Sequence, residues 1–327
     1  MNERNYMYDN LKAFLIFSVV LGHALSRFGS TLETDTLYLI IFSFHMPAFL
    51  FVSGHFAKND PKKLFSKILP LYIVFQLIQI FANPVMDLIE TGIWKMPNIQ
   101  FFKPRWTLWY LVALMLYQLL IPIFETKSKG YRIFYLIFAV VLGIGIGYTP
   151  HTENFLAISR TLVFLPFFVA GYYEKEGRFF TKMRESENRI LIMLLSLITV
   201  VLITMFLAFN STKIPVKYFF GTLTYGDDGL TWYLRLLCMG ISFIWLWFLL
   251  MWTPKKRIPL LGSIGRNTLP IYLLHSIAIY ILLRIPAVTD LVTDNLLWII
   301  IISIIMTLVF SLGFLNKLLR LIKVPLK

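Results

Sequence analysis

The sequence predicts an all-α integral membrane protein, a bundle of about ten transmembrane helices with both termini in the cytoplasm. Of its 327 residues, 58% are apolar and only 15% are charged, and the mean hydropathy is +0.72, above the usual range of soluble proteins. Ten segments are apolar and long enough to cross a hydrocarbon core of about 30 Å. They are 11–29, 36–56, 68–90, 106–124, 132–149, 154–173, 190–209, 230–252, 267–285 and 294–316.

The basic residues predict the orientation of these segments. With the N-terminus inside, 22 of the 31 lysines and arginines fall in one set of loops, and five fall in the opposite set. The remaining four arginines lie in or at the ends of helices. This bias follows the positive-inside rule, which predicts a multi-pass protein of the cell membrane with cytoplasmic N- and C-termini. Because topology accounts for the net charge of +14, we predict membrane lipid and no nucleic acid as a partner.

Local sequence features bear on several of these segments and on the loops between them. The first is too polar at its start and too long for a cleaved signal peptide. The second contains Pro47, which lacks a backbone donor and predicts a kink. Loops 91–105 and 210–229, after the third and seventh segments, are long and contain aromatic residues. We expect them to be ordered lids over an outer cavity, since long loops in compact domains are often functional.

The end of the chain completes this organisation. The ninth segment begins near Arg266 and Asn267, with Pro270 in its first turn. The tail after the tenth segment is too short to fold alone, so we expect one membrane domain over 1–327 without an appended soluble domain. The one cysteine, Cys238, lies inside a predicted helix, which excludes an intrachain disulfide and a zinc-finger site. We predict no metal site and no permanently bound cofactor.

The first predicted helix aligns a lysine with a histidine. Lys12 and His23 are eleven residues apart, which is ~16 Å along a helix and only ~20° around it. A histidine inside a spanning helix usually lines a cavity or a pathway. We therefore interpret His23 as a functional residue, against the alternative of a buried histidine bonded to a carbonyl or a hydroxyl.

The second helix carries His45, within Phe44-His45-Met46-Pro47. This helix runs back toward the cytoplasm, so His45 is expected at a depth similar to that of His23. A catalytic role and a structural role, in which His45 binds the carbonyl freed by Pro47, remain equally open.

Arginines and aromatic residues gather near the predicted outer surface. Arg160, in the sixth helix, either reaches the surface by snorkelling or joins Arg105 and Arg235 in a cationic vestibule for hydroxyls or phosphate. Trp109 is expected among the interfacial aromatics, with a platform for a sugar face as the alternative. His275 in the ninth helix is interpreted as a packing residue, and His55 and His151 as incidental.

Several short motifs occur together in a fixed order. They include Asp9-Asn10-Leu11-Lys12 with Gly22-His23, Phe44-His45-Met46-Pro47 with Ser53-Gly54, Trp109-Tyr110-Leu111, Phe164-Leu165-Pro166-Phe167-Phe168 with Gly171-Tyr172, and Gly265-Arg266-Asn267-Thr268-Leu269-Pro270-Ile271-Tyr272 with His275. Their order, from residue 9 to about 276, resembles that of the acyltransferase-3 membrane family. Within this family, the chain is similar to the fucose 4-O-acetylase-like branch.

The resemblance implies O-acyl transfer, in particular O-acetyl transfer, from cytoplasmic acyl-CoA to a glycan on the outer side. It assigns His23 as the catalytic base, His45 as a second catalytic candidate, and Lys12 as a contact of coenzyme A. Lys12 replaces the arginine usual in the family. A second family element, two basic residues three apart, is only partly met, by Lys67 with Leu64 at the partner position. Lys63 lies beside it, so Lys12, Lys63 and Lys67 are the expected donor-binding residues.

The same geometry fits the donor physically, because the phosphopantetheine arm of acetyl-CoA is of the order of the ~16 Å between Lys12 and His23. Arg105, Trp109 and Arg160 are the expected region for the acceptor or the acyl group. Direct transfer and a covalent acyl-enzyme both remain open, as do acetyl and succinyl groups, the identity of the glycan or glycolipid acceptor, and the oligomeric state. The alternative hypothesis is that the protein is a non-catalytic transporter or flippase for a sugar-linked lipid or small solute.

Overall fold

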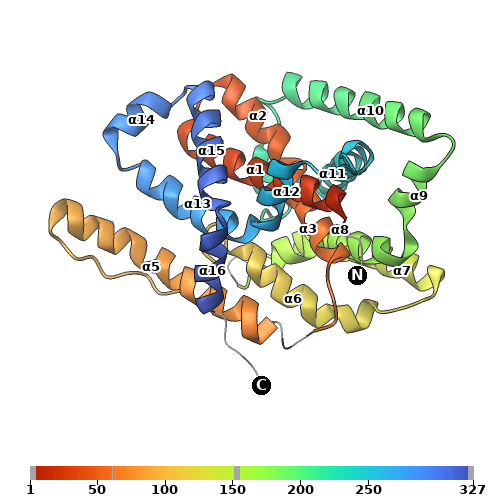
Figure 1. Cartoon of the computed structure of the whole chain (residues 1–327), viewed down its shortest axis with the longest axis horizontal. Helices are drawn as coiled ribbons and strands as arrows, with labels where there is room; N and C mark the ends of the chain where they lie inside the picture. Colours follow the sequence, from red (N-terminus) through yellow and green to blue (C-terminus); the bar gives the residue numbers. More distant parts are fainter. Residues whose placement is uncertain (1–4, 61, 63, 151–154, 323–327) are drawn as a thin grey trace.

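The computed structural model describes residues 5–60, 62, 64–150 and 155–322, and within these ranges the regular elements are all helices (Figure 1). The first half contains α1 (Tyr6–Phe28), α2 (Leu32–Phe42), α3 (His45–His55), the π-helix η1 (Leu64–Ile68), α5 (Leu69–Thr91), α6 (Trp109–Phe124), α7 (Lys129–Gly145) and η2 (Ile146–Tyr148). The middle contains α8 (Ile158–Gly177), α9 (Phe179–Glu185), α10 (Arg189–Phe209), η4 (Val216–Phe219) and η5 (Asp227–Gly229). The last part contains α11 (Trp232–Trp252), α12 (Pro259–Arg266), α13 (Thr268–Leu282), α14 (Pro286–Val292), α15 (Leu296–Phe310) and α16 (Gly313–Leu321).

Each of the ten predicted segments contains a helix, so the all-α prediction is confirmed. Among the residues that the structure describes, six helical segments are long and apolar enough to cross a membrane, or up to eight if each of two bent pairs forms one span. These pairs are α13 with α14, bent by 102°, and α15 with α16, bent by 63°. The count of about ten spans and the side on which the termini lie stay predictions.

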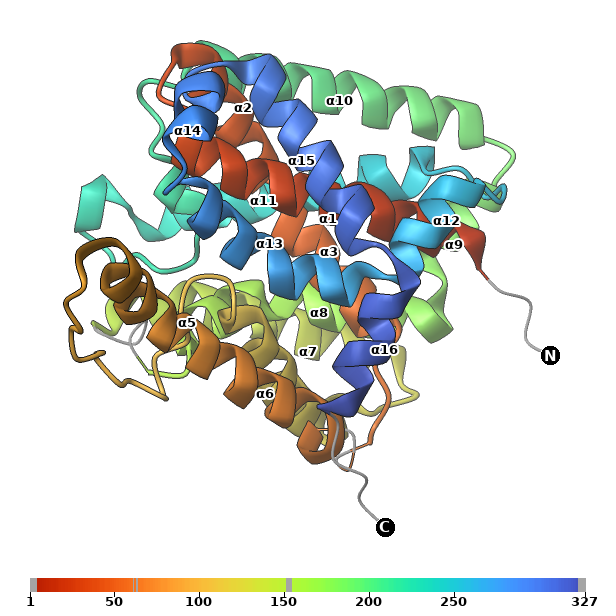
Figure 2. The same cartoon turned by 60° about the vertical axis from the view of Figure 1, so that its left-hand side comes forward.

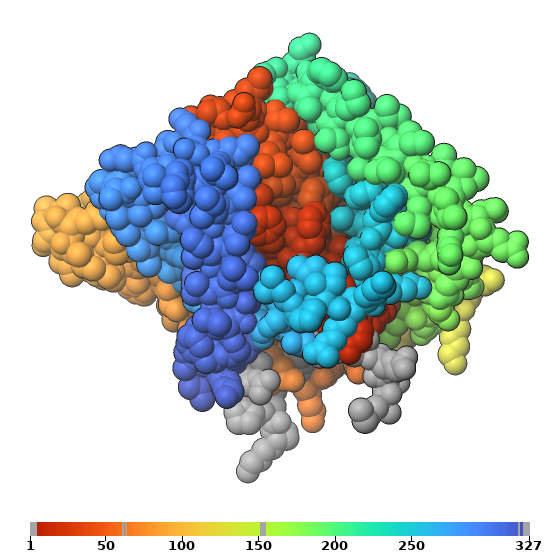
Figure 3. Space-filling model, turned by 45° about the horizontal axis from the view of Figure 1, so that its top comes forward, coloured from red at the N-terminus to blue at the C-terminus, as the bar shows by residue number. Residues whose placement is uncertain are grey.

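Helix α1 lies inside the bundle, whereas α5 and α10 lie at its periphery in both Figure 1 and Figure 2. The burial pattern agrees, because most residues of α1 are buried and few residues of α10 are. Buried residues from Met7 to Leu319 form one hydrophobic core. Figure 3 shows that the N-terminal segment, in red and orange, still reaches the surface between the blue C-terminal helices and the green and cyan segments.

The predicted kink in the second segment is present, one turn before Pro47, where α2 ends and α3 begins. Pro47 cannot donate to the carbonyl of Ser43. That carbonyl instead accepts a 2.6 Å hydrogen bond from the hydroxyl of Ser242 in α11. The carbonyl of Ile41 is 2.8 Å from Nδ1 of His45. Side chains therefore satisfy the backbone groups at the break, as a membrane interior requires.

Glycines allow three helix pairs to touch backbone to backbone. A Cβ atom on Gly54 of α3 would lie 2.0 Å from the carbonyl oxygen of Phe168 in α8. A Cβ atom on Gly171 of α8 would lie 1.9 Å from the carbonyl oxygen of Phe51 in α3. Gly265 of α12 meets the backbone of Asp9 in α1 in the same way. Small residues of this kind are typical of close helix contacts in membranes.

A buried amide also fixes the start of α1. The side chain of Asn10 donates hydrogen bonds of 2.9 and 2.8 Å to the carbonyls of Pro254 and Lys256, in the turn between α11 and α12. Together with the contact at Gly265, these bonds give the Asp9-Asn10 motif a structural role at the start of α1. The motif anchors the helix on which His23 lies.

Both long outer loops are held by side chains of the helices. Gln76 of α5 donates to the carbonyls of Gln100 and Lys103 and accepts a bond from the backbone of Arg105. Buried Arg235 of α11 lies over the ring of Tyr225, with 4.9 Å from its guanidinium carbon to the ring centre, and donates to the carbonyl of Leu223. Arg235 therefore holds the loop that contains Tyr225. The expectation that both loops are ordered lids on the outer side stays a prediction.

The contact between α3 and α8 generates a stability prediction. We expect Gly54→Ala to lower the free energy of unfolding by at least the ~1–3 kcal/mol typical of overpacking, because the new methyl group meets rigid backbone. Gly240→Ala in α11 is the matched control, since a Cβ atom there has no neighbour within 4 Å. Thermal unfolding in detergent measures both, and equal melting temperatures for the two variants would contradict the close contact.

Candidate active site

A cavity of about 510 Å³ collects most of the polar residues that the sequence singles out. Helices α1, α2, α3, α6, α8 and α13 form its walls together with both long loops. The lining includes Val19, His23, Ser26, Arg27, Tyr38, Phe42, His45, Met46, Lys103, Pro104, Trp106, Thr107, Trp109, Ala157, Arg160, Phe164, Phe219, Phe220, Thr222 and Tyr272. We call it the outer cavity, after the loops that cover it.

His23 lies on the wall of this cavity, near the end of α1. Its ring is edge-on to Phe42 and Trp106, with ring centres 5.8 and 5.4 Å away. A third neighbour is the ring of His275 in α13, at 5.3 Å. His23 is partly exposed to the cavity, so a bound molecule can reach its imidazole.

His45 lines the same cavity from the start of α3, so the structure brings the two predicted histidines together. Its Nδ1 atom is hydrogen-bonded to the carbonyl of Ile41, as the structural alternative expects, although the carbonyl freed by Pro47 is that of Ser43. A carbonyl only accepts, so Nδ1 carries the proton and Nε2 of the neutral ring is an acceptor. The same ring therefore has a structural bond and a free acceptor edge at the cavity.

Arg160 and Trp109 face each other across part of the wall. The guanidinium carbon of Arg160 is 5.2 Å from the ring centre of Trp109, which in turn stacks on Phe164 at 5.5 Å. Arg27 and Lys103 add further positive charge. Among the described residues that line the cavity there is no carboxylate, so its field favours anions and electron-rich oxygen atoms.

Arg105 lies apart from this group. It lines a second outer cavity of about 570 Å³, and its guanidinium donates a 2.9 Å hydrogen bond to the carbonyl of Asn98. The two cavities share Trp106, whose backbone has a φ of +38°, a strained value for a bulky side chain. The structure thus separates Arg105 from Trp109 and Arg160 by the ring that also contacts His23.

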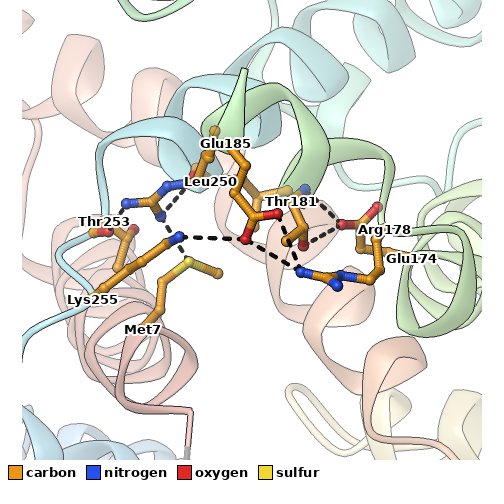
Figure 4. Close-up of polar contacts among 9 residues, drawn as sticks. Met7, Glu174, Arg178, Thr181, Glu185, Leu250, Thr253 and Lys255 are labelled. Carbon is orange, nitrogen blue, oxygen red and sulfur yellow. Dashed lines mark hydrogen bonds and ion pairs between the residues drawn. The ribbon is translucent and has the colours of Figure 1, made fainter. Parts of the chain in front are cut away.

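A recess of about 820 Å³ lies at the opposite end of α1. Tyr8 and His55 stack within it at 4.2 Å, and four basic side chains outnumber two acidic ones in its lining. Figure 4 shows how these charges are held. Glu174 accepts 3.0 Å bonds from the backbone of Phe180 and Thr181, and Glu185 pairs with Arg178 at 3.2 Å. The full set of charged residues in the recess is Glu174, Lys175, Arg178, Arg184, Glu185 and Lys255.

The expected donor-binding lysines are only partly grouped. Lys12 forms a 2.9 Å ion pair with Asp9 and lies over the ring of Phe56, which follows α3. Lys67 is exposed in the π-helix η1. Lys63, like His151, falls outside the described residues.

Apolar side chains fill the space between the recess and the outer cavity. Helices α1 and α3 each run from one to the other, since Tyr8 and His55 line the recess whereas His23 and His45 line the cavity. Between these ends, α1 and α3 contribute residues that are fully buried, among them Leu15, Ile16, Leu50 and Phe51. A hydrogen bond of 2.7 Å joins the hydroxyls of Ser53 and Tyr110 in the same layer.

Comparison with known proteins places this geometry in context. A family model described as an acyltransferase domain matches residues 5–315, which include both cavities and the recess. Neither the curated proteins nor the solved structures contain a match.

The orientation of the outer cavity can be tested by thiol labelling. Because Cys238 is the one cysteine and is buried, Cys238→Ala gives a clean background. We expect a membrane-impermeant thiol reagent added to intact cells to label Ser26→Cys, which lines the cavity. Ser18→Cys, buried on the same helix, is the control and should stay unlabelled. Labelling of Ser26→Cys only after the cytoplasmic face is exposed would reverse the predicted orientation.

Proposed function

The chain belongs to the acyltransferase-3 family, and we propose that it is a membrane O-acyltransferase, in particular an O-acetyltransferase, of the fucose 4-O-acetylase-like branch. It moves an acyl group from cytoplasmic acyl-CoA to a hydroxyl of a cell-surface glycan or glycan precursor on the outer side. About ten spans, with both termini in the cytoplasm, would give the two substrates access from opposite faces. The observation that carries this proposal is the accessible imidazole of His23 in a cationic, aromatic cavity.

In this proposal His23 is the general base. It removes the proton of the acceptor hydroxyl, and the oxygen attacks the thioester carbonyl directly. The carbon–sulfur bond breaks, and the coenzyme A thiolate takes the proton from His23. Direct attack needs both substrates at once and no acyl-enzyme intermediate. His45 is the second imidazole within the same wall, with its acceptor nitrogen available to the reacting groups.

The cationic wall suits the developing charge. The carbonyl oxygen of the thioester gains negative charge in the transition state, and nearby cations stabilise such an oxyanion. Arg160 is the residue we assign to this task or to the acceptor, since it lines the cavity beside Trp109. The ring of Trp109 offers an apolar face for a sugar, and Arg105 would meet a longer glycan at the neighbouring cavity.

The donor would approach from the other end of α1. Lys12, Lys63 and Lys67 are the proposed contacts of the coenzyme A phosphates, and the basic recess beside Tyr8 adds positive charge at that end. From there to His23 is ~16 Å along the helix, comparable to the pantetheine arm. Because Leu15, Ile16 and Leu50 are packed between the two ends, donor binding must part this layer.

The assignment of the base predicts a large loss of activity. His23→Ala should lower acyl transfer by about 10²–10⁴-fold, the usual cost of removing a general base, while the protein remains folded. Transfer from radiolabelled acetyl-CoA to cell-surface glycan by the purified protein measures this. Phe14→Ala, an exposed position of the same helix, is the control and should retain activity. A His23→Ala protein with most of its activity would refute the role of His23.

The arrangement across the membrane predicts transfer between compartments. Right-side-out vesicles loaded with labelled acetyl-CoA should acetylate glycan that is present only outside. A transporter of the rival kind would move a solute without making a covalent acetyl product. Transfer that occurs only with donor and acceptor on the same side would contradict the proposed geometry, even if His23 proves catalytic.

A further inference from the structure

His275 has a buried acceptor atom without a partner. Its Nδ1 atom lies 3.0 Å from the carbonyl of Ile271, one turn earlier in α13. Because the carbonyl can only accept, Nδ1 carries the proton and the lone pair of the neutral ring is on Nε2. The residue is fully buried, and Nε2 makes no hydrogen bond with the described residues. Buried polar atoms are nearly always paired, so an orphan of this kind requires an explanation.

The ring of His23 is the polar neighbour that can supply a donor. The two ring centres are 5.3 Å apart and the planes are tilted by 34°. This separation leaves room between facing ring edges for one N–H···N hydrogen bond of about 3 Å. A rotation of the His23 ring about its Cβ–Cγ bond would align a donor with Nε2. The other aromatic neighbour, Tyr272, already donates its hydroxyl proton to the carbonyl of Thr107.

Neighbouring bonds hold His275 in this place. The bond from Tyr272 to Thr107 is 2.5 Å long, and Gln79 of α5 donates a 3.2 Å bond to Ser276. These bonds fix α13 on both sides of His275. His45 has the same Nδ1 bond to a carbonyl one turn earlier, but its ring lines the cavity, where a bound molecule can satisfy Nε2. His275 does not line the cavity, and His23 is its ring neighbour that does.

We propose that His275 is a positioning residue whose Nε2 atom accepts a hydrogen bond from the protonated ring nitrogen of His23. This bond fixes one tautomer of His23 and leaves its other nitrogen, at the cavity, as the base. When His23 takes the proton of the acceptor hydroxyl, both of its nitrogens are donors, and His275 stabilises the resulting cation. His275 itself neither gains nor loses a proton. The single tautomer of His23 is expected whether or not the protein transfers acyl groups. The effect of His275 on catalysis rests on the proposed acyl transfer.

Nitrogen NMR of the full-length protein with ¹⁵N-labelled histidine tests the pairing directly. The His23→Ala spectrum identifies the signals of His23. In the wild type, His23 should show a single tautomer, and Nε2 of His275 should be an unprotonated, hydrogen-bonded acceptor. In His275→Leu, which fills the space without an acceptor, His23 should become a mixture of tautomers. His275→Gln places an amide near the position of Nε2 and should restore the single form.

A matched control and the kinetics distinguish loss of the hydrogen bond to His23 from a general disturbance of the structure. His55→Leu removes an imidazole at the far end of the bundle and should leave the His23 tautomer unchanged. For acyl transfer, His275→Leu should lower kcat by about 10²-fold with the donor KM unchanged, and His275→Gln should recover most of it. A protonated Nε2 on wild-type His275, which needs no variant to detect, would overturn the proposal. So would an unchanged tautomer in His275→Leu. Absence of acyl transfer by the wild type would refute the proposed function and leave the tautomer result intact.

Discussion

The close contact of α3 with α8 is the constraint on which the two polar sites depend. Gly54 and Gly171 each face a carbonyl oxygen of the opposite helix, so the two backbones pack without room for a side chain between them. The ends of the same helices form both sites: α3 contributes His45 to the outer cavity and His55 to the recess. Helix α8 likewise contributes Arg160 to the cavity and Glu174 to the recess. The contact lies beside the recess, since Gly54 precedes His55 and Gly171 lies one turn before Glu174, and it sets how the two helices lie against each other.

Local sequence was sufficient for the helices and for part of the site. Apolar length identified the long helices, whereas the short helices α9, α12 and α14 lie outside the ten predicted segments. Spacing along α1 and around Pro47 brought His23 and His45 to one place. The approach of His275 to His23 could not be predicted in this way, because it depends on how α13 packs against α1, which no periodicity within α13 encodes. Arg105 was grouped with Arg160 by depth alone, whereas the bond to Asn98 turns it into the neighbouring cavity. Tertiary contacts decide such positions.

The outer cavity also shows how charge is accommodated inside a bundle. An arginine at mid-membrane costs ~3 kcal/mol on insertion scales. Arg27 and Arg160 each lie over a tryptophan ring, and a desolvated cation–π contact offsets part of this cost. A cation–π contact, unlike an ion pair with a carboxylate, does not cancel the positive charge. The described lining therefore combines positive potential with binding surface, which suits a polar, oxygen-rich molecule.

The packed layer around Leu15, Ile16, Leu50 and the Ser53–Tyr110 bond has a consequence for the cell. A permanently open passage between two polar sites at opposite ends of the bundle would conduct ions and protons. Each elementary charge that crosses dissipates about 2.3 kcal/mol per 100 mV of membrane potential. The apolar layer acts as an electrical seal, so an idle enzyme does not drain the gradient that powers the rest of the membrane. In the proposed reaction, a donor arm that parts the layer would also occupy the space that it opens, so the insulation would persist.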